Sequence, residues 1–427
     1  MSTSIIPQKA RTTSKHALGN ALQKTLSRSG RAALLFQLKR LQFGSLTIVA
    51  GTETWRFGDD SAEPELTACI TVNSTHFWAD TALGGSVGAA ESYIHGNWDC
   101  DNLTGLIRIM VRNREVINGL EGGLALLSAP LRALLHWLNR NTTDGSRRNI
   151  AAHYDLGNDF FRLMLDDTMA YSCAVYPYKD ATLLEAQQHK YDSICRQLDL
   201  KPEDHLLEIG TGWGGLAIHA ARSFGCRVTT TTISHEQYVH AQRAVAEAGL
   251  ASKITLLEKD YRELEGIYDK LVSVEMIEAV GHKFLDSYFA VCSRLLKPNG
   301  AMLLQAITIQ DQFYNVALKS VDFIQRFVFP GSFIPSINAI QSSLQRATDL
   351  KVFHLRDIGP HYATTLADWR RNFHNHLDQV RQLGYPDRFI RLWNYYLSYC
   401  EGGFEERQLG DIHMLLTKPL CRRSSLI

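Results

Sequence analysis

The chain has 427 residues, of which 45% are hydrophobic, so its length favours two or three folded domains and its composition excludes a disordered protein. The formal net charge of +1 indicates no nucleic-acid partner, and no run of 18 apolar residues predicts a membrane span. Eight scattered cysteines without a C-x-x-C pair predict neither a zinc site nor a disulfide framework, which fits a reducing, cytoplasmic setting.

Residues 1–44 form a basic N-terminal arm with Lys and Arg side chains and no Asp or Glu. Leu18, Leu22 and Leu26 recur at helical spacing within it. Three interpretations stay open: a transit peptide, a basic amphipathic helix on anionic lipid, or a solvated helical extension.

Residues 45–110 are predicted to form a small α+β domain. Three β-rich pieces, "SLTIVAG", "TWRFGD" and "ELTACITVN", precede a glycine-rich turn at "LGGSVG" and a helix at "AAESYIHGNWD". Residues 111–150 are a helical connector and linker, and the apolar face of "LALLSAPLRALLHWLNRN" either packs between domains or contacts lipid. Residues 151–427 are the catalytic domain.

Strands and helices alternate in this last domain. Buried strands are expected at "HLLEIG", "CRVTTTTIS", "KITLLEKD", "YDKLVSVEMI" and "AMLLQAITI", with helices at 215–225, 236–249 and 285–296. This rhythm predicts an α/β fold with a doubly wound parallel sheet.

A glycine-rich loop, "GTGWGG", follows the first of these strands. Its glycines suit both NAD and S-adenosylmethionine. The carboxylate of Glu208 would repel the pyrophosphate of NAD. It can instead neutralise the cationic amino-acid end of S-adenosylmethionine or orient the loop. The second strand ends at Thr232 and Gln237 without the acid that binds NAD ribose, and Asp260 is placed to accept from an adenine amino group. S-adenosylmethionine is therefore the predicted cofactor.

A mixed aromatic, acidic and cysteine-containing stretch, residues 153–176, precedes this domain's first strand. In order, "HYDLGNDFF", "YSCAVY", "LEIGTGWGG", "TISHEQ", "DYRE" and "SVEMIEAVG" resemble the cyclopropane-fatty-acyl-phospholipid synthases, close relatives of the mycolic acid cyclopropane synthases. The resemblance covers residues 150–420, and "LGGSVGAAESYIHGNWDCDNL" resembles the end of the family's lipid-binding domain. It implies a Rossmann-like methyltransferase domain after a small α+β lipid-binding domain.

The resemblance also implies a reaction. Such enzymes transfer a methylene from S-adenosylmethionine to the cis double bond of unsaturated phospholipid acyl chains in the membrane. The alkene attacks the sulfonium methyl, and bound bicarbonate deprotonates the resulting carbocation as the cyclopropane ring closes. A dry, aromatic-lined site stabilises such a cation. The implied setting is cytoplasmic, peripheral at the inner membrane surface, with a homodimer expected.

Site residues carry over from the family's motifs. The 153–155 segment would cover the cofactor. The cofactor-binding residues are expected to be Tyr171, Ser172, Glu208, Gly210, Gly212, Thr232, Gln237, Asp260 and Tyr261. The bicarbonate site is expected to use Cys173, Glu278, Gln305, the Ile307 backbone and the Tyr362 hydroxyl. Gln305 departs from the family, where many members have His in "LLHTIG", and an amide cannot carry the charge.

Other functions stay open. One is a lipid C-methyltransferase that leaves a methyl or methylene branch on the acyl chain. Another is a small-molecule N-methyltransferase, because plant alkaloid N-methyltransferases share several of these motifs. A third is a non-catalytic lipid-binding protein. The aromatic run at residues 323–336 is expected to be an acyl-chain lid or plain core.

Overall fold

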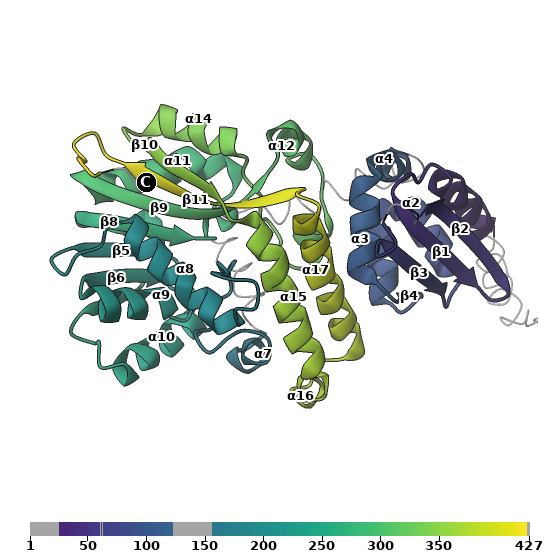
Figure 1. The fold of residues 1–427 in the computed structure, drawn as a ribbon, viewed down its shortest axis with the longest axis horizontal. Helices are drawn as coiled ribbons and strands as arrows, with labels where there is room; N and C mark the ends of the chain where they lie inside the picture. Colours follow the sequence, from purple (N-terminus) through teal and green to yellow (C-terminus); the bar gives the residue numbers. More distant parts are fainter. Residues whose placement is uncertain (1–24, 60, 62, 123–155, 425–427) are drawn as a thin grey trace, which may run out of the picture. The chain divides into compact units, whose positions relative to one another are not determined.

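The structure, a computed structural model, describes residues 25–59, 61, 63–122 and 156–424 (Figure 1). The chain divides into two compact units. The smaller comprises residues 1–132 with 387–395, and the larger comprises residues 133–386 with 396–427. Most of the predicted arm, the apolar stretch of the connector and the segment 153–155 lie outside the described residues.

The small unit is a four-stranded sheet with helices. The sheet order is β2-β1-β3-β4, in which β1 pairs parallel with β3. Its elements are β1 (Gly44–Ala50), β2 (Glu53–Asp59), β3 (Thr67–Val72), α2 (His76–Ile94), β4 (Trp98–Cys100), α3 (Leu103–Arg112) and α4 (Arg114–Gly122).

Two features of the small unit differ from the sequence prediction. Residues 25–38 are helical, and Leu34 and Leu38 are buried, so this part of the predicted arm belongs to the core of the unit. The predicted glycine-rich turn is instead part of helix α2, in which Gly85 alone leaves the helical conformation, with φ 59° and ψ −144°. Only glycine adopts such an angle without strain, so the turn signal marks a kink within the helix.

The large unit is built on a seven-stranded sheet of order β10-β11-β9-β8-β5-β6-β7. The four pairs among β5 to β9 are parallel, and β11 is antiparallel to β9 and β10. The strands are β5 (His205–Ile209), β6 (Arg227–Thr232), β7 (Ile254–Glu258), β8 (Tyr268–Val274), β9 (Leu296–Ile309), β10 (Lys351–Asp357) and β11 (Leu409–Thr417). All five predicted strands are present, but β10 and β11 were not predicted.

Helices cover both faces of this sheet (Figure 1). The α-helices are α7 (Asn158–Arg162), α8 (Leu183–Gln197), α9 (Gly215–His219), α10 (His235–Glu247), α11 (Leu285–Leu295), α12 (Asp311–Ala317), α13 (Phe323–Phe327), α14 (Ile337–Ala347), α15 (Gly359–Asn375), α16 (Leu377–Gln382) and α17 (Asp387–Glu405). Short turns are η2 (Ala220–Phe224), η3 (Tyr261–Glu263), η4 (Ile277–Ala279) and η5 (His282–Phe284). The first half of α17 is counted with the small unit.

Successive strand residues point to opposite faces and fill two separate cores. Leu206 and Leu303 pack with α8, α9 and α10. Their neighbours Leu207 and Leu304 pack with α11 and α14 on the other face. This period of two is the reason that the parallel strands read as continuous apolar runs in the sequence. Burial on both faces fixes the register, and so fixes which residues end each strand at the carboxyl edge.

Candidate active site

The glycine-rich loop lies at the carboxyl end of β5, between β6 and β8, where the strand order reverses. Ligands of open α/β sheets bind at this point. Gly210 has φ 102° and Gly212 has φ 53°, angles that favour glycine. A Cβ atom on Gly212 would meet nothing within 4 Å, so the loop backbone faces open space and suits a bound cofactor.

Glu208, on strand β5, is linked to this loop by hydrogen bonds through the hydroxyl of Thr230. Its carboxylate accepts a hydrogen bond from the Thr230 hydroxyl at 2.6 Å, and that hydroxyl lies 2.7 Å from the hydroxyl of Thr211 in the loop. Burial raises the pKa of Glu208 to about 8. Of the two roles open from the sequence, the geometry therefore favours orientation of the loop over neutralisation of a cofactor charge.

The residues expected beside adenosine follow the next two strands. Thr232 ends β6, and its hydroxyl donates to the Gln237 side chain at 2.9 Å. Asp260 follows β7 and accepts from the Arg262 guanidinium at 2.6 Å. The ring of Tyr261 packs edge-on against a buried tyrosine of α11. These four predicted residues thus gather at the same edge as the glycine loop.

An aromatic wall, defined here as Phe161, Tyr171, Tyr362, Trp369 and Phe404, lies beside the site. Tyr171 packs against Phe161 and Trp369 with ring centroids 5.2 and 5.1 Å apart. Tyr362 packs against Phe404 at 4.5 Å. Stacked rings of this kind exclude water and stabilise cations through their π faces.

Glu275 is the residue at which the predicted catalytic groups converge. It directly follows β8 and has φ 45°, a conformation that costs free energy for a residue with a side chain. Its Oε1 accepts from the Cys173 backbone N–H and from Gln305 Nε2, each at 2.8 Å. Its Oε2 accepts from the Tyr362 hydroxyl at 2.6 Å. Its two oxygens thus accept from three donors that belong to three different segments of the chain.

Glu278 lies one turn further along the chain. It accepts from the Ile307 backbone N–H at 2.7 Å. Burial, reinforced by the charge of Glu275, raises the pKa of Glu278 to about 8, so this acid is mainly protonated at neutral pH. The Cys173 thiol donates to backbone carbonyls, and burial raises its pKa well above the usual range. Cys173 therefore contributes its backbone N–H and not a thiolate.

A buried polar network from β9 and β11 supports Glu275. Gln305 Nε2 also donates to Asp411 at 3.1 Å, and Gln305 Oε1 lies 3.1 Å from His413 Nε2. Burial, then the charge of Glu275, raises the pKa of Asp411 well above its usual range. Burial lowers the pKa of His413 to about 3, so His413 is a neutral donor to the amide of Gln305.

One buried cation lies near these acids. Lys190 of α8 donates to the Ser172 hydroxyl at 2.6 Å. Burial lowers the pKa of Lys190, and the charge of Glu275 opposes that shift most strongly. The Ser172 hydroxyl is therefore engaged by Lys190, a contact that the sequence did not predict.

These contacts do not fit the predicted bicarbonate. The N–H of Cys173, the amide of Gln305 and the hydroxyl of Tyr362 already donate to Glu275. The Ile307 N–H, the remaining expected donor, is used by Glu278. A bicarbonate at this place would compete with the carboxylates of Glu275 and Glu278 for these four donors. In this arrangement the residues expected to hold bicarbonate are bound to Glu275 and Glu278 instead, and bound bicarbonate stays a prediction.

Sequence reasoning missed four members of this cluster. Glu275 is the first acid of "SVEMIEAVG" and ends a buried strand, a signal as strong as the one that singled out Glu278. Asp411 and His413 lie on β11, an unpredicted strand, where each is fully buried. Lys190 has no sequence signal, because a lysine on an amphipathic helix is usually exposed.

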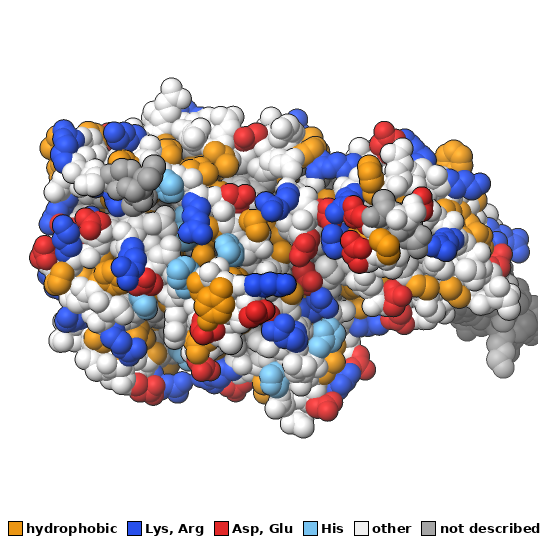
Figure 2. Space-filling model, in the orientation of Figure 1, with side chains coloured by type: hydrophobic (Ala, Val, Ile, Leu, Met, Phe, Trp, Pro, Cys, Tyr) orange, Lys and Arg blue, Asp and Glu red, His pale blue; other side chains and the backbone are white. Residues whose placement is uncertain are grey.

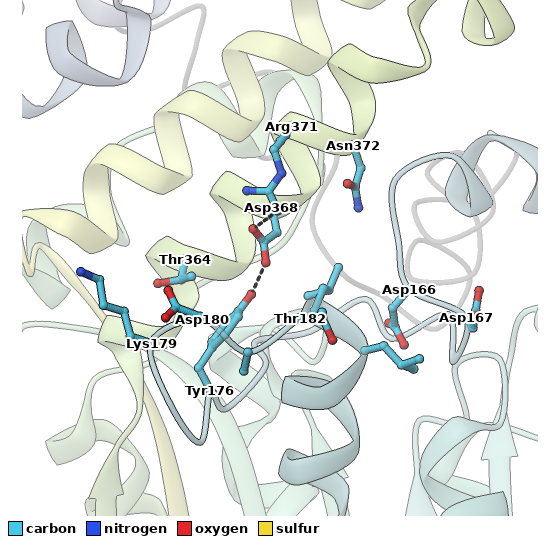
Figure 3. Close-up of a pocket in the computed structure, with 13 residues that line it drawn as sticks. Asp166, Asp167, Tyr176, Lys179, Asp180, Thr182, Thr364, Asp368, Arg371 and Asn372 are labelled. Atoms are coloured by element: carbon cyan, nitrogen blue, oxygen red, sulfur yellow. Dashed lines mark hydrogen bonds and ion pairs between the residues drawn. The ribbon is translucent and has the colours of Figure 1, made fainter.

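A pocket of about 620 Å³ lies elsewhere in the large unit (Figure 3). Its lining includes Asp166, Asp180, Asp368 and Arg371. Asp368 accepts from the Tyr176 hydroxyl and from Arg371, as the dashed lines show. None of the predicted site residues lines this pocket. Its acidic, solvated lining is unsuited to an apolar chain or to a carbocation.

The sheet order, the glycine loop at the switch point and the strand that ends in Thr232 instead of an acid together define an S-adenosylmethionine-dependent methyltransferase. The family model for mycolic acid cyclopropane synthetase matches residues 141–414, and the chain belongs to this family.

Curated relatives agree with this assignment. The chain is 37% identical to the Escherichia coli cyclopropane-fatty-acyl-phospholipid synthase over 345 residues, which are 80% of this chain and 86% of the relative. It is 36% identical to the Mycobacterium tuberculosis tuberculostearic acid methyltransferase UfaA1 over 343 residues, 76% of this chain and 77% of the relative. The recognised resemblance and the enzyme class are confirmed.

Solved structures agree with the fold. The mycolic acid cyclopropane synthase CmaA1, complexed with S-adenosylhomocysteine and CTAB, matches with a TM-score of 0.60 and 31% identity, over 64% of this chain and 98% of that chain. Coclaurine N-methyltransferase matches with a TM-score of 0.58 at 19% identity, over 78% of this chain and 99% of that chain, and so shares the fold alone. The predicted fold class is confirmed.

Proposed function

We propose that this enzyme converts the cis double bond of an unsaturated phospholipid acyl chain into a cyclopropane ring. The observation that carries the proposal is the Tyr362–Glu275 contact, which joins a half-buried carboxylate to the aromatic wall. A base within a dry aromatic site is what the deprotonation of a carbocation requires. The 37% identity to a cyclopropane-fatty-acyl-phospholipid synthase over 80% of the chain supports the same substrate class.

S-adenosylmethionine, when bound, supplies a methyl group on a sulfonium sulfur. Gly210 and Gly212 let the backbone approach its amino-acid end, while Thr232, Gln237, Asp260 and Tyr261 are placed for its adenosine. Tyr171 lies in the aromatic wall, and its hydroxyl lies 2.9 Å from that of Tyr396. We expect the rings of this wall to stabilise a cation, whether sulfonium or carbocation.

Mass spectrometry of fatty acids tests this proposal. Purified enzyme is incubated with S-adenosylmethionine and vesicles of cis-monounsaturated phospholipid. The expected product is heavier than the substrate acid by one methylene and has no double bond. An unchanged fatty-acid profile, from protein that binds S-adenosylhomocysteine, would contradict the proposal.

A second candidate, a fatty-acid C-methyltransferase that leaves a branched chain, is favoured by one observation. The Glu275 carboxylate at this site accepts from Gln305, which stands where many family members have a histidine, and the position of the proton acceptor decides which proton is removed. The 36% identity to a tuberculostearic acid methyltransferase agrees with this candidate. Both products gain the same mass, but the branched product keeps an alkene.

We also propose peripheral contact with the membrane and a homodimer, both resting on the family resemblance. Among the helices of the described ranges, none is long and apolar enough to cross a membrane. On the face drawn in Figure 2, Lys and Arg side chains are interspersed with Asp and Glu, so a contact through the basic residues 1–24 is the more specific expectation. Co-sedimentation with anionic vesicles at low salt tests it, and recovery of the enzyme in the supernatant would contradict it.

A further inference from the structure

Glu275 occupies the place where the family resemblance expects a free anion. Its two carboxylate oxygens accept from a backbone N–H, an amide and a phenol, and these belong to three of the residues expected to hold bicarbonate. The donors come from the 171–173 segment, β9 and α15, elements that are far apart in the sequence. Their convergence on one side chain is not a local packing effect, because each donor is fixed by a different element.

The backbone of Glu275 is held in a costly conformation. It has φ 45°, which glycine adopts freely and which is unfavourable for a residue with a side chain. The backbone N–H of Glu275 is bound to the Gln305 carbonyl at 2.9 Å, which holds the residue in register with β9. Such strain persists when the surrounding structure compensates for it, and it concentrates at functional sites.

Three further ionisable side chains lie around Glu275. Asp411 from β11 and Glu278 from η4 are the other two acids, and burial raises the pKa of both. The buried ammonium of Lys190 on α8 interacts favourably with the charge of Glu275. Two acids with raised pKa values, one lysine and the Tyr362 phenol therefore surround the Glu275 carboxylate.

We propose that Glu275 is the catalytic base of this enzyme and replaces the free bicarbonate. This inference rests on the proposed function. The π electrons of the substrate alkene form a bond to the methyl carbon, and the S–CH3 bond breaks with its electron pair left on sulfur, which leaves S-adenosylhomocysteine. The remaining alkene carbon becomes a carbocation. Glu275 removes a proton from the transferred methyl group, and the C–H electron pair closes the ring. Glu275 is then neutral and returns its proton to solvent.

Three variants test the proposal. Glu275→Gln keeps the shape but cannot accept a proton, so turnover should fall by about 10²–10⁴-fold and bicarbonate should not restore it. Glu275→Gly removes the side chain at a positive φ that suits glycine, so the fold should survive. Without an added anion, turnover by Glu275→Gly should be as slow as turnover by Glu275→Gln. Bicarbonate, formate or acetate should raise it at least about tenfold, because the three donors that Glu275 occupied can then hold a small carboxylate. Glu203→Gln, an exposed acid, is the matched control.

Binding provides a readout independent of turnover. With S-adenosylhomocysteine bound, the Glu275→Gly variant should broaden the ¹³C NMR signal of labelled bicarbonate, and the wild type and Glu275→Gln should not. If the wild type makes no product with any lipid, the proposed function fails, while this contrast still reports whether Glu275 occupies the anion's place. The proposal is overturned if bicarbonate accelerates the wild type, if Glu275→Gln turns over at the wild-type rate, or if no anion binds to or rescues Glu275→Gly.

Discussion

The two halves of the active site differ in how they are built. The cofactor half, at the ends of β5, β6 and β7, consists of short motifs such as the glycine loop, in which neighbours in sequence are neighbours in space. The base half, at β8, β9 and β11, assembles Glu275, Gln305 and Asp411, of which Glu275 is 30 residues and Asp411 is 106 residues from Gln305 in the sequence. The cofactor half follows the family's pattern, and the base half departs from it. We therefore expect local motifs to bind the methyl donor and long-range packing to decide the fate of the proposed carbocation.

The largest expected effect is a loss of cofactor affinity from a substitution in the cofactor half. Gly210→Val places a branched side chain at φ 102°, beside Met276, and should lower S-adenosylhomocysteine affinity by about 100-fold or more. Gly249→Val has the same kind of positive φ at an exposed position and should leave affinity unchanged. Calorimetric titration measures both, and equal losses in the two variants would show a general folding defect instead.

The next largest effect is a loss of kcat from a substitution in the base half. Tyr362→Phe removes the hydroxyl that donates to Glu275 and should lower kcat by about 10–100-fold, the worth of a hydrogen bond to a charged group. Cofactor affinity should not change, because Tyr362 lies outside the cofactor half. Tyr178→Phe, which removes an exposed hydroxyl bound to Glu185, is the control. A loss of cofactor affinity equal to the loss of kcat would contradict the separation of the halves.

A smaller effect is expected at Asp411. Because burial raises the pKa of this acid and keeps it neutral, Asp411→Asn preserves a neutral donor and acceptor, and kcat should stay within about threefold of the wild type. Asp411→Leu removes the acceptor of Gln305 and should lower kcat more. Steady-state kinetics of the two variants distinguishes a neutral from an ionised Asp411. A large loss of kcat in Asp411→Asn would mean that the reaction requires the negative charge of Asp411.

The smallest effect concerns stability, and both halves contribute to it. Glu208 and Glu278 have pKa values of about 8 in the folded protein against an ordinary 4.5. For an acid whose folded pKa is raised, stability is fully present below the unfolded pKa and is lost as pH rises through the folded pKa. The melting temperature should therefore fall between about pH 5 and about pH 8, by roughly 2–4 °C for each kcal/mol lost. Over this pH range the melting temperature of Glu278→Gln should fall less than that of Glu203→Gln. Identical falls in the two variants would contradict a raised pKa for Glu278.

The sequence predicts more of the cofactor half than of the base half for a physical reason. Continuous apolar runs in the sequence predict the parallel strands, and the spacing of the glycines predicts the cofactor loop. Strand β11 carries Asp411 and His413 within an apolar run, where buried acids are rare and no local signal says that Gln305 pairs with them. Glu275 is visible in the sequence, but that its side chain would turn toward Cys173 and Tyr362 depends on its φ of 45°.

A crystal structure of the wild-type enzyme, grown with S-adenosylhomocysteine and soaked in bicarbonate, tests the central claim most directly. The account predicts that the Glu275 carboxylate lies within hydrogen-bond distance of the Cys173 N–H, Gln305 and the Tyr362 hydroxyl, with no carbonate density between them. A carbonate anion bound to those three donors, with Glu275 rotated away, would contradict it.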